Sequence, residues 1–178
     1  MDPLRKADQE LDREMHKQVD MIYSAAAIAF ARYWNDGWGP KRIKALFEKT
    51  AETWDECGET NEISMLQMLE DETGIEVKIR ETDKSWHELA YLNSSIKLER
   101  MTKAQWIYMR QRQKLWIGAQ VMACMFLALH RKYGFGPQRL LRLMEQIDDI
   151  RNEFNWDRKA LVQACEDEAR VVLREAMG

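Results

Sequence analysis

The chain has 178 residues, of which 46% are hydrophobic and 32% charged, and its formal net charge is −3. This composition excludes an intrinsically disordered chain, and 8 Gly and 3 Pro are too few for the many turns of an all-β protein. The three cysteines show no C-x-x-C spacing, which favours reduced thiols in a cytoplasm over a disulfide framework. No apolar signal segment is present, and the most apolar stretch, 115–129, is too short to span a membrane.

Good helix formers fill the chain, so we predict an all-α protein. The first helix is apolar nearly all round at 25–31 and should therefore be central and buried. Gly37 is expected to end it in a left-handed conformation, which glycine adopts without steric strain. Pro40 then fits the first position of a second helix, where a missing N–H is harmless. A shorter third helix is predicted at 63–72.

The second half of the chain repeats this order of elements. A long helix is predicted from Lys103 to Tyr133, with its apolar part at 121–129. Gly134 and Pro137 stand where Gly37 and Pro40 stand in the first half, so the same helix corner is expected. A third helix should run from Lys159 to about residue 176. Ser85 is expected to cap a short helix in the segment that joins the two halves.

The repeat is visible in the residues themselves. Gly37-Trp38-Gly39-Pro40 recurs as Gly134-Phe135-Gly136-Pro137, 97 positions further on (137 − 40). Matches at this offset, with one single-residue slip, extend over roughly 50 residues, which indicates an internal duplication. We therefore predict two pseudo-repeated three-helix units joined by a helical connector. The first unit, with an N-terminal helix extension, covers 1–80, the connector 81–102 and the second unit 103–178.

The seven tryptophans are expected to divide between core and surface. Trp34, Trp54 and Trp116 lie on apolar helix faces and are predicted to be core residues. Trp38, at the first corner, and Trp86, in the connector, are the two expected to be partly exposed. Exposed aromatic side chains favour protein–protein contact surfaces.

Two motifs carry a resemblance to a known group of proteins. The segment 127–141 contains Leu-His-x-x-Tyr-Gly-Phe-Gly-Pro, and the first unit closes on Glu-Thr-Gly-Ile at 72–75. Together they resemble short helical proteins of unsettled function encoded by phages and prophages of Firmicutes. The sequence departs from that pattern at Tyr133, where those proteins have phenylalanine, and at 169–171, where Ala-Arg-Val replaces the second motif. The resemblance implies a mobile-element origin, a bacterial cytoplasm and no catalytic residue.

No pattern predicts catalysis, a metal or a cofactor. His16, His87 and His130 stand far apart and outside any metal-binding motif. The carboxylate triplets at 70–72 and 166–168 cannot converge on one ion, because consecutive helical residues point in different directions. We therefore expect a protein that is not an enzyme. A small-molecule pocket between the two units, near His130 and the two corners, remains open as a third interpretation.

The segment between Lys49 and Lys78 contains no Lys or Arg and nine acidic residues. These are Glu52, Asp55, Glu56, Glu59, Glu62, Glu70, Asp71, Glu72 and Glu76. Such a block repels itself unless it meets a basic partner. It leads to the hypothesis of an acidic surface that binds a bacterial protein. The sharpest version is an inhibitor of a defence nuclease such as a Cas effector, although an ordinary solvated surface explains the block equally well.

The opposite charge gathers between Lys97 and Lys114, where the balance is +5. On a helix, Arg100, Lys103, Arg110 and Lys114 form one basic stripe beside Trp106. Basic side chains next to an aromatic ring suit phosphate contact and base stacking. The alternative function is therefore a nucleic-acid-binding phage replication or regulatory factor. An ordinary exposed helix, or a homodimer in which the stripe meets a second copy's acidic block, explains the stripe as well.

Overall fold

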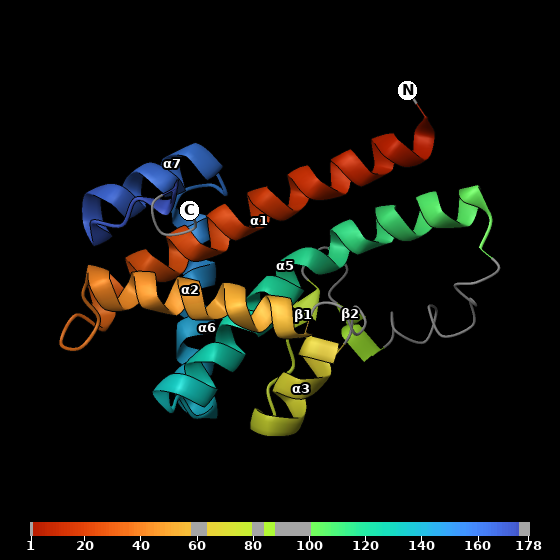
Figure 1. The fold of residues 1–178 in the computed structure, drawn as a ribbon. Helices are drawn as coiled ribbons and strands as arrows, with labels where there is room; N and C mark the ends of the chain where they lie inside the picture. The colour runs from red at the N-terminus through yellow and green to blue at the C-terminus, as the bar shows by residue number, and fades with distance from the viewer. Residues whose placement is uncertain (1, 58–63, 80–83, 88–100, 175–178) are drawn as a thin grey trace.

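The computed structural model describes residues 2–57, 64–79, 84–87 and 101–174, and within them the chain is almost entirely helical (Figure 1). The helices are α1 Pro3–Tyr33, α2 Pro40–Cys57, α3 Ser64–Thr73, α5 Lys103–Tyr133, α6 Pro137–Glu153 and α7 Arg158–Ala164, which continues into the π-helical turn η2 Cys165–Ala169. The described residues also contain one antiparallel pair of two-residue strands, β1 Lys78–Ile79 and β2 Lys84–Ser85. The predicted helical class is thus confirmed.

The two long helices form the centre of the molecule. α1 and α5 have 31 residues each and pack on each other more extensively than any other pair of elements. All side chains of 21–30 in α1 and of 119–129 in α5 are buried. Four of the α1 residues are alanines, whose small side chains let a neighbouring helix approach closely. The prediction that both apolar helices are central is confirmed.

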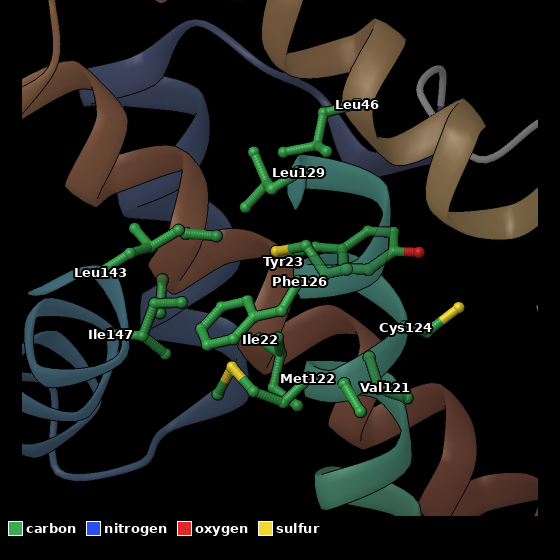
Figure 2. Packing of buried hydrophobic residues seen from close by; sticks show 14 of the residues in the cluster. Ile22, Tyr23, Leu46, Val121, Met122, Cys124, Phe126, Leu129, Leu143 and Ile147 are labelled. Carbon is green, nitrogen blue, oxygen red and sulfur yellow. The ribbon is translucent and has the colours of Figure 1, made fainter. Parts of the chain in front are cut away.

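The shorter helices of each predicted unit cover the long helix of the other unit. α2 and α3 pack on α5, whereas α6 and α7 pack on α1. One continuous cluster of buried hydrophobic side chains runs through all these elements. In Figure 2, Phe126 of α5 lies on the side facing Leu143 and Ile147 of α6, with Ile22 of α1 nearby. The predicted units therefore share one core.

The two corners between helices differ in how the first helix ends. Gly134 has φ 70° and caps α5 in the left-handed conformation, as predicted. The same prediction for Gly37 is wrong, since the left-handed glycines of the described chain are Gly74 and Gly134. α1 already ends at Tyr33, so the chain turns at Trp34 (φ −128°), before it reaches the glycine. α2 and α6 begin at proline, as expected.

The third helix of the second half is shorter than predicted. It does not run to residue 176, because Arg170 takes a left-handed conformation (φ 56°) directly after η2. The Arg170 N–H donates to Glu166 O at 3.1 Å, and Val171 behind it is buried. In the first half, the N–H of left-handed Gly74 donates to Glu70 O at 2.7 Å. A non-glycine residue at such a position is not signalled by the sequence.

The connector begins as a strand pair and then leaves the described residues. Lys84–Ser85 form β2, and helical residues follow at Trp86, which agrees with a helix starting after Ser85. The rest of the predicted connector helix, 88–100, lies outside the described residues. Trp86 itself is only 2% exposed, so the expectation of a partly exposed side chain is wrong. Val77 and Ile79, in and beside the first strand, are buried as well.

None of the three cysteines forms a disulfide, as predicted, and all three are buried. Burial raises the pKa of the Cys165 thiol to about 12 and that of Cys124 further still. Because the thiolate is the reactive form, we expect Cys124 and Cys165 of the native protein to resist a thiol reagent at pH 8. Titration with a chromogenic disulfide should detect them only after denaturant is added. Rapid labelling of both in native buffer would contradict this burial.

Candidate interaction surfaces

Ion pairs with α1 occupy most of the predicted basic stripe. Lys103 Nζ lies 2.5 Å from Asp2, Arg110 Nε 2.6 Å from Asp8 and Lys114 Nζ 3.4 Å from Glu10. The first turns of α1 and α5 run side by side in the same direction, so each base meets an acid from the neighbouring helix (Figure 1). Trp106 is partly buried, with the Arg110 guanidinium 5.3 Å from its ring centre. Arg100 lies outside the described residues.

The acidic residues of α3 point in three directions. Glu70 accepts from the His87 ring at 2.7 Å, Asp71 from the Gln67 amide at 2.8 Å, and Glu72 from Arg131 of α5 at 2.6 and 3.0 Å. The Arg131 hydrogen bonds hold the pKa of Glu72 below its usual value. All three carboxylates therefore bind side chains of the same chain. The divergence expected of consecutive helical residues is confirmed.

Near the C-terminus of α2 the acidic residues remain open to solvent. Glu52, Asp55 and Glu56 are exposed and spaced i, i+3 and i+4, which places them along one side of the helix. Glu52 lies 3.4 Å from the Lys49 ammonium. Within the described chain, Asp55 and Glu56 form no ion pair. Glu59 and Glu62 lie outside the described residues.

α3 packs beside the end of α2. The Cys57 thiol at the end of α2 lies 3.9 Å from the Met68 sulfur of α3. Asp71, one turn beyond Met68, is exposed. We call Glu52, Asp55, Glu56 and Asp71 the acidic surface. Glu76, the last acid of the predicted block, lies elsewhere, on the rim of a groove described below.

The charges of α2 oppose its helix dipole. Lys41 and Arg42 occupy its first turn, which holds no acid, whereas Asp55 and Glu56 lie near its end, where the last turn holds no base. A helix dipole favours the reverse arrangement by about 0.3–1 kcal/mol per charge. These charges therefore do not serve the stability of α2. A role in contacts outside the chain explains their placement better.

The two Gly-x-Gly-Pro corners meet in one aromatic cluster. Trp38 stacks on Phe30 with ring centres 4.2 Å apart and lies 4.8 Å from Tyr133. Phe135 of the second corner lies 5.4 Å from Trp34 and 5.9 Å from Trp38. Trp38 is only 5% exposed, so the prediction of a partly exposed side chain is wrong. The N-termini of α2 and α6 are thereby held at the same end of the molecule.

Basic side chains surround this cluster. The Arg42 guanidinium lies 4.5 Å from the Trp38 ring centre and 5.1 Å from that of Tyr133. Arg139 lies over Phe135, Arg142 over Trp34 and Lys132 over Tyr133, at 5.3, 6.0 and 5.5 Å. We call Lys41, Arg42, Lys132, Arg139 and Arg142 the cationic corner. All five are exposed, and none is ion-paired with an acid among the described residues.

The cationic corner was not predicted from the sequence. Its members come from two segments separated by about half of the chain. Two signals were available: the segment 131–142 holds four bases and no acid, and Arg42 and Arg139 occupy equivalent positions after the two Gly-x-Gly-Pro motifs. The contact of Arg42 with Trp38 is repeated by Arg139 with Phe135, also at the equivalent position.

All three histidines contact other groups of the same chain. The His130 Nδ1 lies 2.8 Å from the Phe135 carbonyl oxygen and ties the end of α5 to its corner. His16 contacts the Asp12 carbonyl at 2.8 Å, and His87 contacts Glu70. Over the described ranges, no three His, Cys, Asp or Glu side chains gather in a way that could hold a metal ion.

A groove of about 670 Å³ lies between α1, α5 and α6. Methionines line its apolar part (Met21, Met122 and Met144), and two exposed leucines, Leu115 and Leu141, stand beside them. Neither His130 nor either corner lines it, so the expected pocket near those residues does not coincide with this groove. At one end, the buried guanidinium of Arg151 is held by Asp148 and lies 4.2 Å from the Trp156 ring centre.

Comparison with protein-family models finds no family that matches this chain, and comparisons with curated proteins and with solved structures find no match either. Among the described helices, none is both long and apolar enough to cross a membrane.

Proposed function

We propose that this protein is not an enzyme and acts by binding a basic surface of another protein through its acidic surface. The observation that carries the proposal is the pair Asp55 and Glu56, two exposed carboxylates without an ion pair in the described chain. They stand at the end of α2 where the helix dipole disfavours them. A partner that supplies Lys or Arg side chains would offset the unfavourable interaction of these carboxylates with the helix dipole.

The partner class follows from the geometry of the charges. Glu52 lies one turn from both Asp55 and Glu56, with about 5–6 Å between the Cβ atoms of each such pair, so the three carboxylates form a small negative patch on the helix. Such a patch can replace nucleic-acid phosphates in a positively charged channel. The sharpest version of the proposal is an inhibitor of a bacterial DNA-handling defence enzyme, such as a Cas effector. A phage origin and a bacterial cytoplasm rest on the motif resemblance alone.

The double substitution Asp55→Lys with Glu56→Lys tests this proposal. Tagged protein is incubated with nuclease-treated bacterial lysate, and retained proteins are identified by mass spectrometry. We expect a basic, DNA-handling protein to be retained by the native chain and lost by the double variant. The new lysines lie at the C-terminus of α2, where the dipole favours them, so the fold should not be weakened.

The matched control is Glu145→Lys with Asp149→Lys. These residues are exposed on α6, at the positions that correspond to Glu48 and Glu52 in the repeat, and the change in net charge is the same. The control should retain the partner. Equal retention by both double variants would show that net charge or another surface is responsible, and the acidic surface would then have no role in binding.

The alternative proposal, nucleic-acid binding by the basic stripe, is less well supported. The ion pairs of Lys103, Arg110 and Lys114 with α1 leave little of the stripe's charge uncompensated. A phosphate would have to displace these acids, so the affinity gained per contact would be small. Replacing Arg110 and Lys114 by Glu remains its direct test.

We also infer that the two units are copies of one ancestral unit. Besides the sequence match, equivalent side chains make equivalent contacts in both halves. The Gln67 amide donates to Asp71 at 2.8 Å, and Gln163 donates to Asp167 at 3.0 Å. Left-handed Gly74 and Arg170 end the third helix in each half. These pairs support duplication because chance would not repeat contacts at one offset.

A further inference from the structure

We propose that the cationic corner is a nucleic-acid-binding surface that contacts the phosphate backbone. It is formed where the two Gly-x-Gly-Pro corners meet, by Lys41, Arg42, Lys132, Arg139 and Arg142. This surface is distinct from the acidic surface and from the basic stripe. The proposal therefore does not depend on the function proposed above.

Uncompensated charge distinguishes this surface from the stripe. The bases at 103, 110 and 114 each have an acid of α1 within ion-pair distance. At the ends of α1 and α5, Arg32 is likewise held by Glu153 and Glu168, and Arg131 by Glu72. The five bases of the cationic corner have no such acid among the described residues. Their charge remains available to an external anion.

Backbone donors point to the same kind of ligand. The first N–H groups of α2 and α6 have no partner within their own helices, and the helix dipole is positive there. Gly136 gives α6 no side-chain cap. Around both Gly39 and Gly136, the position that a Cβ would take has no other atom within 4 Å, so an anion can approach the backbone. Phosphate oxygens accept hydrogen bonds from such amides and from arginine together.

The aromatic cluster makes the surface rigid. The Arg42 guanidinium is fixed over two rings and also donates to the Gly37 carbonyl at 2.8 Å. A basic side chain that is already ordered loses little conformational entropy when it binds a phosphate. Beside the cluster, Tyr33 is 58% exposed and offers a ring on which an unpaired base can stack. Repeated basic side chains next to an exposed aromatic ring suit a nucleic acid better than an acidic peptide.

The two charged surfaces lie at opposite ends of the same helix. Lys41 and Arg42 begin α2, and Asp55 and Glu56 lie near its other end. An 18-residue helix is about 27 Å long, so each surface can be changed without touching the other. A nucleic acid at one end would leave the acidic surface free for a protein partner.

The test is the binding of a fluorescein-labelled single strand of about 30 nucleotides, followed by anisotropy. We expect the native chain to bind it at 50 mM salt and to lose roughly 50-fold in affinity at 200 mM salt, as about four phosphate contacts with a single strand require. The double variant Lys41→Glu with Arg139→Glu should bind at least about 100-fold more weakly at 50 mM salt. Because both substitutions place acids in first turns, its melting temperature should be unchanged or higher.

The matched control is Lys6→Glu with Arg13→Glu, two exposed bases of α1 outside the cationic corner. It carries the same change in net charge and should bind the single strand like the native chain. Equal weakening by both double variants, or no binding by the native chain, would overturn the proposal. Poly-glutamate that competes as strongly as an unlabelled strand would also overturn it, because the surface would then select negative charge rather than phosphate.

Discussion

Replacing Phe126 by alanine should lower the free energy of unfolding by about 3–5 kcal/mol, the usual range for deleting a fully buried phenylalanine. Phe126 has no exposed surface and lies in the buried C-terminal half of α5, the helix that α1, α2 and α3 all contact. In Figure 2 its ring also faces Leu143 and Ile147 of α6. The cavity left by alanine would therefore remove contacts between both predicted units at once.

Urea unfolding followed by circular dichroism measures this loss. In a chain of this size, it corresponds to a fall in melting temperature on the order of 10 °C. Phe126→Leu, which retains most of the buried volume, should cost less than about 1.5 kcal/mol. Two separate transitions for the native chain would contradict a shared core. In that case the loss on Phe126→Ala would appear in the transition of the second half alone.

Much of the helical order could be predicted because each element has a local signal. Pro40 and Pro137 fit only the start of a helix, and the apolar segments at 25–31 and 121–129 have no polar side that could face water. The end of α7 had no such signal. Arg170 adopts a left-handed conformation that is uncommon for its residue type, and its buried neighbour Val171 follows from tertiary packing.

The packing of the helices on one another could not be predicted in the same way. Both long helices are apolar all round in their buried segments, 21–30 and 119–129, so nothing local indicates which shorter helix covers which long one. The structure places α2 on α5 and α6 on α1. The three helices of one predicted unit therefore do not form a separate bundle, because the shorter helices of each unit pack on the long helix of the other.

The candidate surfaces show why charge runs in a sequence are incomplete guides. The basic stripe was predicted from one segment, but its partners Asp2, Asp8 and Glu10 come from a helix about a hundred positions earlier. Glu72 is likewise paired with Arg131, 59 positions away. The cationic corner shows the opposite error, since its basic side chains come from two segments that only the fold brings together.

Trp38 is the residue for which sequence and structure predict opposite results. As a partly exposed side chain, it could be replaced by alanine with a loss of at most about 0.5 kcal/mol, as at most surface positions. In the structure it is buried and stacks on Phe30. It also joins the first corner to Tyr133 and Phe135 of the second. We therefore expect Trp38→Ala to cost about 3–5 kcal/mol.

Trp38→Phe separates the ring contacts from the rest of the corner. A phenyl ring keeps a face for Phe30 and for the Arg42 guanidinium, so it should restore more than half of the stability lost with alanine. Tyr33→Ala, at an exposed aromatic position five residues earlier, should change stability by less than about 0.5 kcal/mol and serves as the control. Unfolding in guanidinium chloride ranks the three variants. If Trp38→Ala proved as mild as Tyr33→Ala, the two corners would not be joined through Trp38, and the charges around them would have no common platform.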